Sequence, residues 1–465
     1  MPARIDWKLP ESLRRVLDET PELRSALLVG GCVRDALLGI EPKDLDFEVL
    51  GLGLEDLAAA LARWGATDQV GRSFGVLKLR LAEGTWVDFA VPRRDSKTGA
   101  GHRGFEMQFD PSITRAEAAA RRDFTINSLA SDPRTGEVFD DHGGLSDLEA
   151  GVLRHTSPAF AEDPLRVLRA MQFAARFDFT VAPETVELCR SLADTFAELP
   201  LERVREEWSK WASLAKRPSR GLAFLRECGW LRHFPELATL EGVPQDREWH
   251  PEGDVWTHTL HVVDALADLP IWRAADEETR VITMLGALTH DLGKAGTTRF
   301  ELREGVERVT SARHDQAGLP LAESLLARMG MPEGVVRRAL PLVKEHMAHL
   351  GPPTPRSVRR LSNRLSPATI AELALVIRAD AAARPPLPPE PPASLEALLA
   401  MAAELHVADE APRPLLLGRH LLAAGWSPGP GMGAALAKAF EAQLDGEFAD
   451  LDGALAWVAA HVERA

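Results

Sequence analysis

LLVGGCVRDALLGIEPKDLDFEVL, residues 27–50, is the stretch that decides the fold of the N-terminal part of the chain. An apolar run at 26–29 predicts a buried strand. Gly30 and Gly31 follow it, where a glycine turn lets the backbone approach a phosphate, and 33–38 predicts a helix whose first N–H groups face that turn. The stretch predicts a strand, a phosphate-binding turn and a helix. Helix capping by itself would be enough to explain the two glycines.

The same stretch ends in alternating acidic and apolar residues. In DLDFEV, residues 44–49, a period of two places the three apolar side chains on the core face of a strand, and Asp44 and Asp46 on the other face. Their Cα atoms would lie roughly 7 Å apart. Two such carboxylates beside a phosphate-binding turn can hold two divalent ions about 4 Å apart for an in-line displacement on a triphosphate. A solvated strand face is the alternative for an isolated Asp-x-Asp.

A second stretch, RRDFTINSLA at 121–130, accompanies the first. The combination GGxVRDxLLGxxxxDxD with RRDFTINSLA resembles the head domain of the class II tRNA nucleotidyltransferases and bacterial poly(A) polymerases, in the polymerase-beta-like superfamily. The resemblance implies that Asp44 and Asp46 ligate Mg²⁺ and that Asp88, in the strand-like run 85–90, is the third catalytic carboxylate. It also implies a nucleotide site made of Gly30, Gly31, Arg34, Arg121, Arg122, Asp123 and Asn127. Exposed charges before the next element would equally explain Arg121 and Arg122. The polar loop 95–104 resembles the family's mobile loop, which terminal A addition needs.

Residues 161–169, AEDPLRVLR, predict a helix start with Asp163 as N-cap and Pro164 at N1. A capped helix with Arg166 and Arg169 on its surface is one interpretation. The other is that GluAspxxArg resembles the family's nucleotide-reading motif, in which Asp163 and Arg166 replace a template strand and Arg169 belongs to the same site. A carboxylate accepts from the exocyclic amine of cytosine or adenine, and a guanidinium donates to the adjacent ring nitrogen. Uracil and guanine present a carbonyl where the carboxylate needs a donor.

Seven of the 14 histidines fall between 250 and 349, an enrichment that indicates metal binding. The order His, His-Asp, Asp, with HisAspLeuGlyLys at 290–294, resembles the HD phosphohydrolase superfamily in the version attached to proteobacterial-type CCA-adding enzymes. Imidazole and carboxylate ligands suit Mn²⁺, Ni²⁺, Co²⁺ or Mg²⁺, which would activate a water against a phosphoester. We expect His261 and His349 at the surface. The candidate ligands are His258, His290, Asp291 and Asp380, with His314 and His346 for a second ion.

The composition limits the class of protein. A length of 465 residues suits several domains, and three widely spaced cysteines without CxxC argue against a disulfide framework and suit the cytoplasm. The sequence has neither an apolar run of 18 residues nor a signal-like start. We therefore expect a soluble protein without a membrane partner. The net charge of −15 opposes a nucleic-acid partner unless positive charge is segregated. Residues 203–220 offer one basic stretch, which a solvated helix face explains equally well.

We therefore predict an α+β fold: a polymerase-beta-like α/β head at 1–155, an all-α neck and body at 156–240, an α-helical HD domain at 241–385, and a Pro-rich linker with a small helical segment at 386–465. From about residue 156 we expect helices almost exclusively. The predicted function is template-independent addition of C, C and A, or part of that sequence, to tRNA 3′ ends from CTP and ATP. The alternatives are a poly(A) polymerase, and an HD phosphodiesterase or phosphatase with a non-catalytic RNA-binding head.

Overall fold

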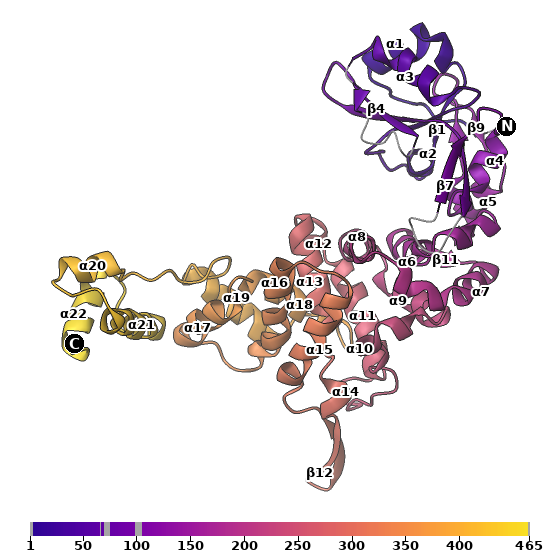
Figure 1. Cartoon of the computed structure of the whole chain (residues 1–465). Helices are drawn as coiled ribbons and strands as arrows, with labels where there is room; N and C mark the ends of the chain where they lie inside the picture. The colour runs from indigo at the N-terminus through magenta and orange to yellow at the C-terminus, as the bar shows by residue number, and fades with distance from the viewer. Residues whose placement is uncertain (1–2, 66, 69–74, 98–104, 464–465) are drawn as a thin grey trace. The chain divides into compact units, whose positions relative to one another are not determined.

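The computed structural model describes residues 3–65, 67–68, 75–97 and 105–463 (Figure 1). The chain forms two compact units, residues 1–207 with 220–230, and residues 208–219 with 231–465. Within the described ranges, every helix is too short or too polar to cross a membrane.

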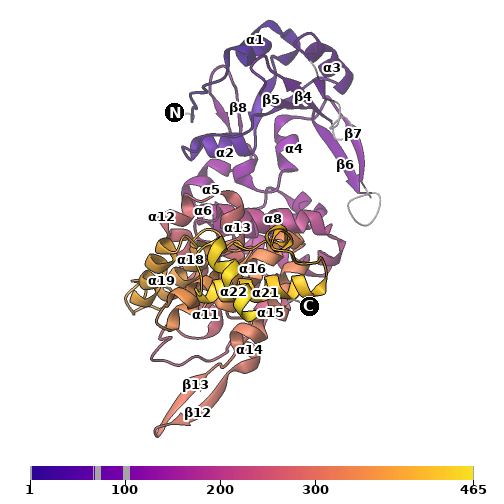
Figure 2. The same ribbon diagram turned by 90° about the vertical axis from the view of Figure 1, so that its left-hand side faces the viewer.

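A seven-stranded sheet of order β3-β4-β5-β2-β1-β8-β9 forms the N-terminal part of the first unit. Strand β2 runs parallel to β5, and the other neighbours are antiparallel. In Figures 1 and 2, α1 (Glu11–Glu19) and α3 (Leu54–Ala62) cover one side of the sheet, and α2 (Gly31–Leu37) and α4 (Arg115–Ala120) lie on the other. The strands are β1 (Ala26–Val29), β2 (Asp46–Val49), β3 (Thr67–Asp68), β4 (Val76–Arg80), β5 (Trp86–Ala90), β8 (Ala130–Ser131) and β9 (Val138–Phe139).

The alternation in β2 has the predicted result. Phe47 and Val49 are buried, and Phe47 stacks on Phe89 of β5 with ring centroids 4.9 Å apart. The strand predicted at 26–29 is confirmed with its bounds, and the strands predicted at 44–49 and 85–90 begin two residues and one residue later, at Asp46 and Trp86. Residues 93–97 and 105–109 form the paired strands β6 (Arg93–Lys97) and β7 (Phe105–Phe109), while 98–104 of the predicted mobile loop lie outside the described residues.

Helices follow the sheet in the first unit, as predicted. Helix α6 (Leu165–Phe177) is buried along most of its length, which suits its apolar residues at i, i+3 and i+4. The short parallel pair β10 (Val152–Leu153) and β11 (Thr180–Val181) interrupts them. The other helices are α5 (Gly144–Ala150), α7 (Pro183–Ser191), α8 (Leu201–Leu214) and α9 (Pro218–Glu227).

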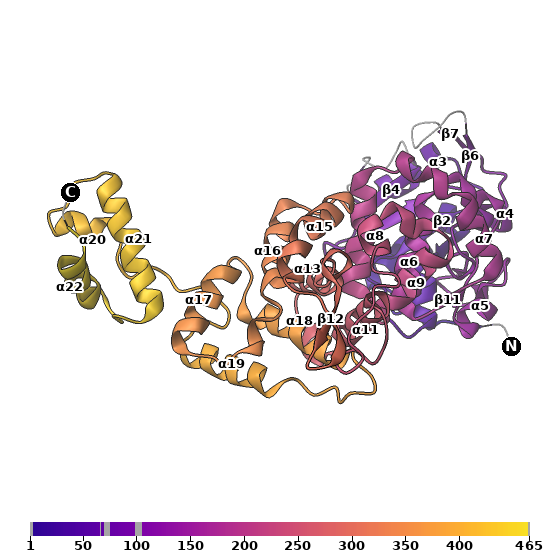
Figure 3. The same cartoon turned by 90° about the horizontal axis from the view of Figure 1, so that it is seen from below.

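The second unit is built around α13 (Glu277–Thr289), whose residues 281–289 are all buried. It packs against α11 (Val255–Asp268), α16 (Glu333–Glu345) and α18 (Ile370–Ala382). A separate apolar core holds α20 (Gly418–Ala423), α21 (Pro430–Asp445) and α22 (Leu451–His461), which lie side by side in Figure 3. The remaining helices are α10 (Pro235–Ala238), α12 (Pro270–Arg273), α14 (Lys294–Thr297), α15 (His314–Arg328), α17 (Pro355–Leu365) and α19 (Ala393–Glu404).

The prediction of helices almost exclusively after residue 156 is wrong at one place in the second unit. Strands β12 (Arg299–Arg303) and β13 (Val306–Thr310) form an antiparallel hairpin (Figure 2). Its two-residue turn, Glu304-Gly305, has φ of +52° and +81°, the conformation of tight hairpin turns. The Pro-rich segment does break helical structure, because α18 ends at Ala382 and α19 begins at Ala393.

Candidate functional sites

Three carboxylates lie close together at the paired strands β2 and β5 in the first unit. Asp46 and Asp88 are register partners across this parallel pair, so their side chains share one face. Asp44 lies two residues earlier, ahead of the first residue of β2, and is exposed. Lys78 of β4 extends its Nζ to 3.1 Å from Asp88 Oδ2. The sheet thus brings together the acidic residues that the sequence singled out.

Asp46 experiences both desolvation and electrostatic repulsion. Its side chain stays accessible, but the carboxylate lies among neighbouring atoms, and this desolvation raises its pKa. The carboxylates of Asp88 and Asp44 raise the pKa further, while Arg122 and Lys78 lower it. A bound cation would relieve this repulsion, so the donor set fits divalent metal ions. The three carboxylates are less tightly gathered than single-ion clusters, which among the described residues occur only in the second unit.

The glycine turn lies next to basic side chains. Gly30 has φ of +74°, and a Cβ there would lie 2.7 Å from Arg122 Nη1, so the turn requires glycine. Arg122 also approaches Glu48 Oε1, at 3.5 Å. The buried Arg34 of α2 donates to Asn127 Oδ1. The structure therefore assembles Gly30, Arg34, Arg122 and Asn127, from two distant motifs, around one turn.

Asp123 is buried, and both of its oxygens are used internally. Oδ1 accepts from the Phe124 amide at 2.8 Å and from Asn127 Nδ2 at 2.9 Å, and Oδ2 accepts from Arg169 Nε at 2.7 Å. Burial would raise the pKa of Asp123, but Arg169 and Asn127 outweigh it and hold the pKa below its usual value. Asp123 and Arg169 thus join the second motif to α6, an arrangement that suits positioning of the nucleotide site.

The start of α6 shows how the second pair of candidates is held. Asp163 is extended, and its Oδ1 accepts from the Leu165 amide at 3.1 Å, as a capping residue would, although α6 begins at Leu165 with Pro164 as its N-cap residue, one position later than predicted. Its Oδ2 lies 3.1 Å from Arg203 Nη2 of α8. Arg166 donates to the backbone oxygens of Arg121, at 2.6 Å, and Ala159, at 2.8 Å. Arg203, rather than Arg166, is therefore the guanidinium in contact with Asp163 in this arrangement.

The basic stretch at 203–220 is not a free positive surface. Besides Arg203, three of its arginines lie close to carboxylates, which favours the alternative of a solvated helix face. Local acidic partners neutralise these side chains, which no pattern of basic residues alone could show. The pairs are Arg205 with Glu202 at 3.5 Å, Arg217 with Asp264 at 3.5 Å, and Arg220 with Asp178 at 2.9 Å.

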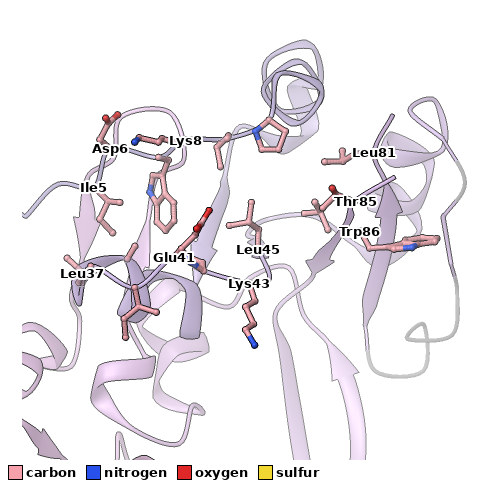
Figure 4. Close-up of a pocket in the computed structure, with 18 of the residues that line it drawn as sticks. Ile5, Asp6, Lys8, Leu37, Glu41, Lys43, Leu45, Leu81, Thr85 and Trp86 are labelled. Atoms are coloured by element: carbon pink, nitrogen blue, oxygen red, sulfur yellow. The ribbon is translucent and has the colours of Figure 1, made fainter. Parts of the chain in front are cut away.

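A pocket of about 770 Å³ opens beside the Asp44 loop (Figure 4). Trp7, Lys8, Glu41, Lys43 and Trp86 help to line it. The three carboxylates are not among the described residues of its wall. The pocket therefore lies next to the three carboxylates, and they do not form its wall.

The second unit brings the predicted HD residues together from five helices. His258 lies on α11, Asp380 on α18, and His290-Asp291 directly after α13. His258 Nε2 is 3.2 Å from Asp380 Oδ1, and His290 Nε2 is 3.2 Å from Asp291 Oδ2. His258, His290 and Asp380 offer ligand atoms that all lie within 4.8 Å of one another. These three residues belong to the first predicted metal group, which also includes Asp291.

The second group shares the Asp291 carboxylate. Asp291 Oδ1 is 3.2 Å from Nε2 of His314, which begins α15, and that nitrogen is 3.1 Å from Nε2 of His346, directly after α16. Asp291 thus presents one oxygen to each group. Burial would raise its pKa, but the charges of His290 and Lys294 hold the pKa well below its usual value. The Lys294 ammonium lies 2.7 Å from Asp291 Oδ2.

Buried polar atoms without aligned partners show that this cluster fits divalent ions. Nδ1 of His290, His314 and His346 faces the backbone oxygen three residues earlier, at 2.7, 2.8 and 2.6 Å, which leaves each Nε2 directed into the cluster. Among the described residues, several cluster atoms have no aligned hydrogen bond. They are His258 Nδ1 and Nε2, His290 Nε2, Asp291 Oδ2 and Glu252 Oε2.

Several residues near this cluster were not predicted from the sequence. His250 and Glu252 lie against His258, and the His-x-Glu pair ahead of α11 was the available signal. The expectation of a surface position for His349 is wrong, because a 3₁₀ turn after α16 buries it to 7% exposure. His261 is half-buried.

Comparison with known proteins identifies the relatives. Residues 26–154 match the family model of the poly A polymerase head domain, and 178–240 match "Probable RNA and SrmB- binding site of polymerase A". The multifunctional CCA protein of Xanthomonas campestris pv. campestris is 39% identical over 424 residues, covering 89% of this chain and 96% of the relative. That of Nitrosococcus oceani is 38% identical over 366 residues, 77% and 84% of the two chains.

Solved structures show the same fold. The Bacillus stearothermophilus CCA-adding enzyme in complex with CTP superposes with a TM-score of 0.62 at 22% identity, covering 97% of this chain and 98% of that one. The Thermotoga maritima CCA-adding enzyme complexed with tRNA gives 0.57 at 21% identity, with 99% and 97% coverage. The predicted α+β fold with a polymerase-beta-like head is confirmed. Since the identity with a curated relative reaches 39% over most of both sequences, this chain belongs to the family of the multifunctional CCA proteins.

Proposed function

We propose that this chain is a tRNA nucleotidyltransferase that adds C, C and A, or part of that sequence, to tRNA 3′ ends from CTP and ATP. The observation that carries the proposal is the pairing of Asp46 with Asp88 across β2 and β5, next to Asp44 and the glycine turn. Relatives named for CCA addition, and likenesses to CCA-adding enzymes in complexes with CTP and tRNA, support it. A poly(A) polymerase on the same head is the alternative.

The three carboxylates explain how nucleotidyl transfer would proceed. Asp44, Asp46 and Asp88 would hold Mg²⁺, which polarises the attacking hydroxyl and neutralises the leaving pyrophosphate when it is bound. The tRNA 3′-OH attacks the α-phosphorus, and the bond to pyrophosphate breaks. The turn at Gly30 lets the backbone approach the triphosphate, and Arg122 beside it supplies positive charge. Arg34 and Asn127 support the turn from beneath.

Base selection is the second part of the proposal. Asp163 is fixed by the Leu165 amide and Arg203, so its carboxylate has a defined direction in which to accept from the amine of cytosine or adenine. Arg166 is held by two backbone oxygens and would donate to the neighbouring ring nitrogen with its remaining N–H groups. A rigid carboxylate and guanidinium would select C and A without a nucleic-acid template.

The histidine cluster is proposed as a separate phosphohydrolase. His258, His290, Asp291 and Asp380 would hold one divalent ion, and Asp291, His314 and His346 a second, with Asp291 shared. Either ion would lower the pKa of a bound water when present. Mn²⁺, Ni²⁺, Co²⁺ and Mg²⁺ suit these ligands. Lys294 supplies positive charge close to where a phosphate would bind.

The predicted organisation completes the proposal. It comprises a head at 1–155, a neck and body at 156–240, an HD domain at 241–385 and a linker with a helical segment at 386–465. Cys32, Cys189 and Cys228 are free and buried, which suits a reducing compartment, and we place the protein in the cytoplasm.

Tail addition is tested with tRNA transcripts that end before the tail, after one C, and after CC. With Mg²⁺ and each labelled NTP, we expect CTP to extend the first two transcripts, ATP the third, and UTP and GTP none. Growth of long A tracts on any RNA, with CTP ignored, would identify a poly(A) polymerase instead.

Base selection is tested by Asp163→Ala and Arg166→Ala, with Arg190→Ala on the exposed face of α7 as control. Each lost contact should relax the preference for C and A by roughly 1–3 kcal/mol, or about 5- to 150-fold in kcat/KM ratios among the four NTPs. If Asp163 were only a cap, its loss would cost about 1 kcal/mol of stability and leave the ratios unchanged. Unchanged ratios in Arg166→Ala would rule out the reading of bases by these side chains.

The hydrolase is tested by His290→Ala and Asp291→Ala, with His261→Ala as a matched control outside the ligand set. We expect loss of metal-stimulated hydrolysis of 2′,3′-cyclic nucleotides in the first two, with tail addition retained, because the ligands lie outside the head. Hydrolysis is measured with Mg²⁺, Mn²⁺, Ni²⁺ and Co²⁺ in turn. A wild-type protein that is inactive with all four would reduce the cluster to a structural remnant.

A further inference from the structure

Glu252 is a carboxylate that lies against the histidine cluster and has no role in the proposed reactions. Its side chain is fully buried, with Oε1 2.7 Å from His258 Nδ1 and 2.9 Å from His250 Nδ1. Its Oε2 has no hydrogen-bond partner among the described residues. Burying a carboxylate is unfavourable unless neighbouring groups stabilise its charge, so this position requires a physical reason.

The two nitrogens of His258 face different carboxylates. Nε2 lies 3.2 Å from Asp380 Oδ1 and 3.8 Å from Asp291 Oδ2, on the side of the proposed ion. Nδ1 lies on the Glu252 side. A neutral imidazole has one N–H and one lone pair. A lone pair on Nδ1 would face the Glu252 oxygen at 2.7 Å and be repelled, so the carboxylate favours the tautomer with the proton on Nδ1.

That tautomer leaves the Nε2 lone pair directed at Asp380 and Asp291, as ligation of an ion requires. The 2.7 Å contact is too poorly aligned for a directed hydrogen bond. The influence of Glu252 is therefore chiefly electrostatic, and it depends on the negative charge. Oε1 of Glu252 lies within 3 Å of two imidazole nitrogens, from His250 and His258, which stabilise its negative charge.

His258 is distinguished in this way from the other histidines of the cluster. His290, His314 and His346 direct Nδ1 at neutral backbone oxygens, whereas His258 directs it at a carboxylate. A carboxylate behind a ligating imidazole fixes the ring and makes it a stronger donor to the metal. His258 lies in the group that also contains Asp380 and His290, so the effect falls on the first ion.

We infer that Glu252 is a positioning residue for the metal centre, which fixes His258 as an Nε2 ligand and strengthens binding of the first ion, while His250 supports Glu252 from the other side. This inference rests on the proposed metal site of the HD domain.

A third ion held by His250, Glu252 and His258 is the competing explanation, since their ligand atoms lie within 4.8 Å of one another. That ion would need Nδ1 of His258 while Nε2 serves the first ion. The imidazole would then lose both N–H protons, which strongly disfavours this arrangement.

The test is Co²⁺ binding to the full-length protein, followed by calorimetry and by visible absorption of the bound ion. Glu252→Gln keeps the shape of the side chain and removes its charge. Glu248→Gln is the matched control, because Glu248 lies in the same loop, pairs with Arg308 and is exposed. At the histidine cluster we expect two ions in the wild type, in addition to any that the head carboxylates bind. In Glu252→Gln we expect roughly 10- to 100-fold weaker binding of the first of these ions and an altered absorption band, and in Glu248→Gln little change.

The unfolding temperature of the metal-free variants and their tail addition check the fold. If Glu252→Gln is unstable, Glu252→Asp replaces it in the test. This variant keeps the charge but moves it away from His258 by one methylene group, and it should also weaken binding of the first ion. Unchanged affinity in folded Glu252→Gln overturns the inference, as does a third ion that disappears in Glu252→Gln. A wild type that binds Co²⁺ without any hydrolysis refutes the phosphohydrolase and leaves the role of Glu252 intact. A wild type that binds no ion overturns both.

Discussion

The parallel pairing of β2 with β5 is the constraint on which the proposed nucleotidyltransferase site depends. Its register sets Asp46 opposite Asp88, and the stacked Phe47 and Phe89 hold that register from the core side. A slip of β2 by one residue would turn Asp46 into the core and Phe47 to solvent, at a cost of several kcal/mol. The apolar face of the sheet thus determines the geometry of its polar face.

Side chains from outside the sheet complete the site through long-range contacts. Arg122 fills the space above Gly30 that any larger residue would need, and Asp123 holds Arg169 of α6. Because Asp123 is buried with both oxygens satisfied, removing Arg169 would leave an unpaired buried charge, which is strongly unfavourable. The same logic applies in the second unit, where one carboxylate, Asp291, faces histidines from three sides.

The sequence predicted elements and motif residues well, and side-chain partners poorly. Alternation identified β2 and β5, and the resemblance to HD proteins picked out six candidate ligands that the structure brings together. Glu252 was missed because its role depends on a contact with His258, six positions away, that no periodicity records. His349 was misplaced since a 3₁₀ turn, not the helical period, buries it. The paired arginines of 203–220 show that charge counted along the chain does not measure charge at the surface.

The most direct test of the account is single-turnover CTP addition by Asp46→Asn with Mg²⁺, compared with Glu41→Gln. Glu41 is an exposed carboxylate of the same loop that lines the neighbouring pocket. If the Asp46–Asp88 pair holds the catalytic ions, Asp46→Asn should lose about a thousandfold in rate, equivalent to roughly 4 kcal/mol of transition-state stabilisation, with its circular dichroism unchanged. Glu41→Gln should remain close to the wild type. Retention of more than a few per cent of the wild-type rate by Asp46→Asn would contradict the assignment of the three carboxylates to the catalytic site.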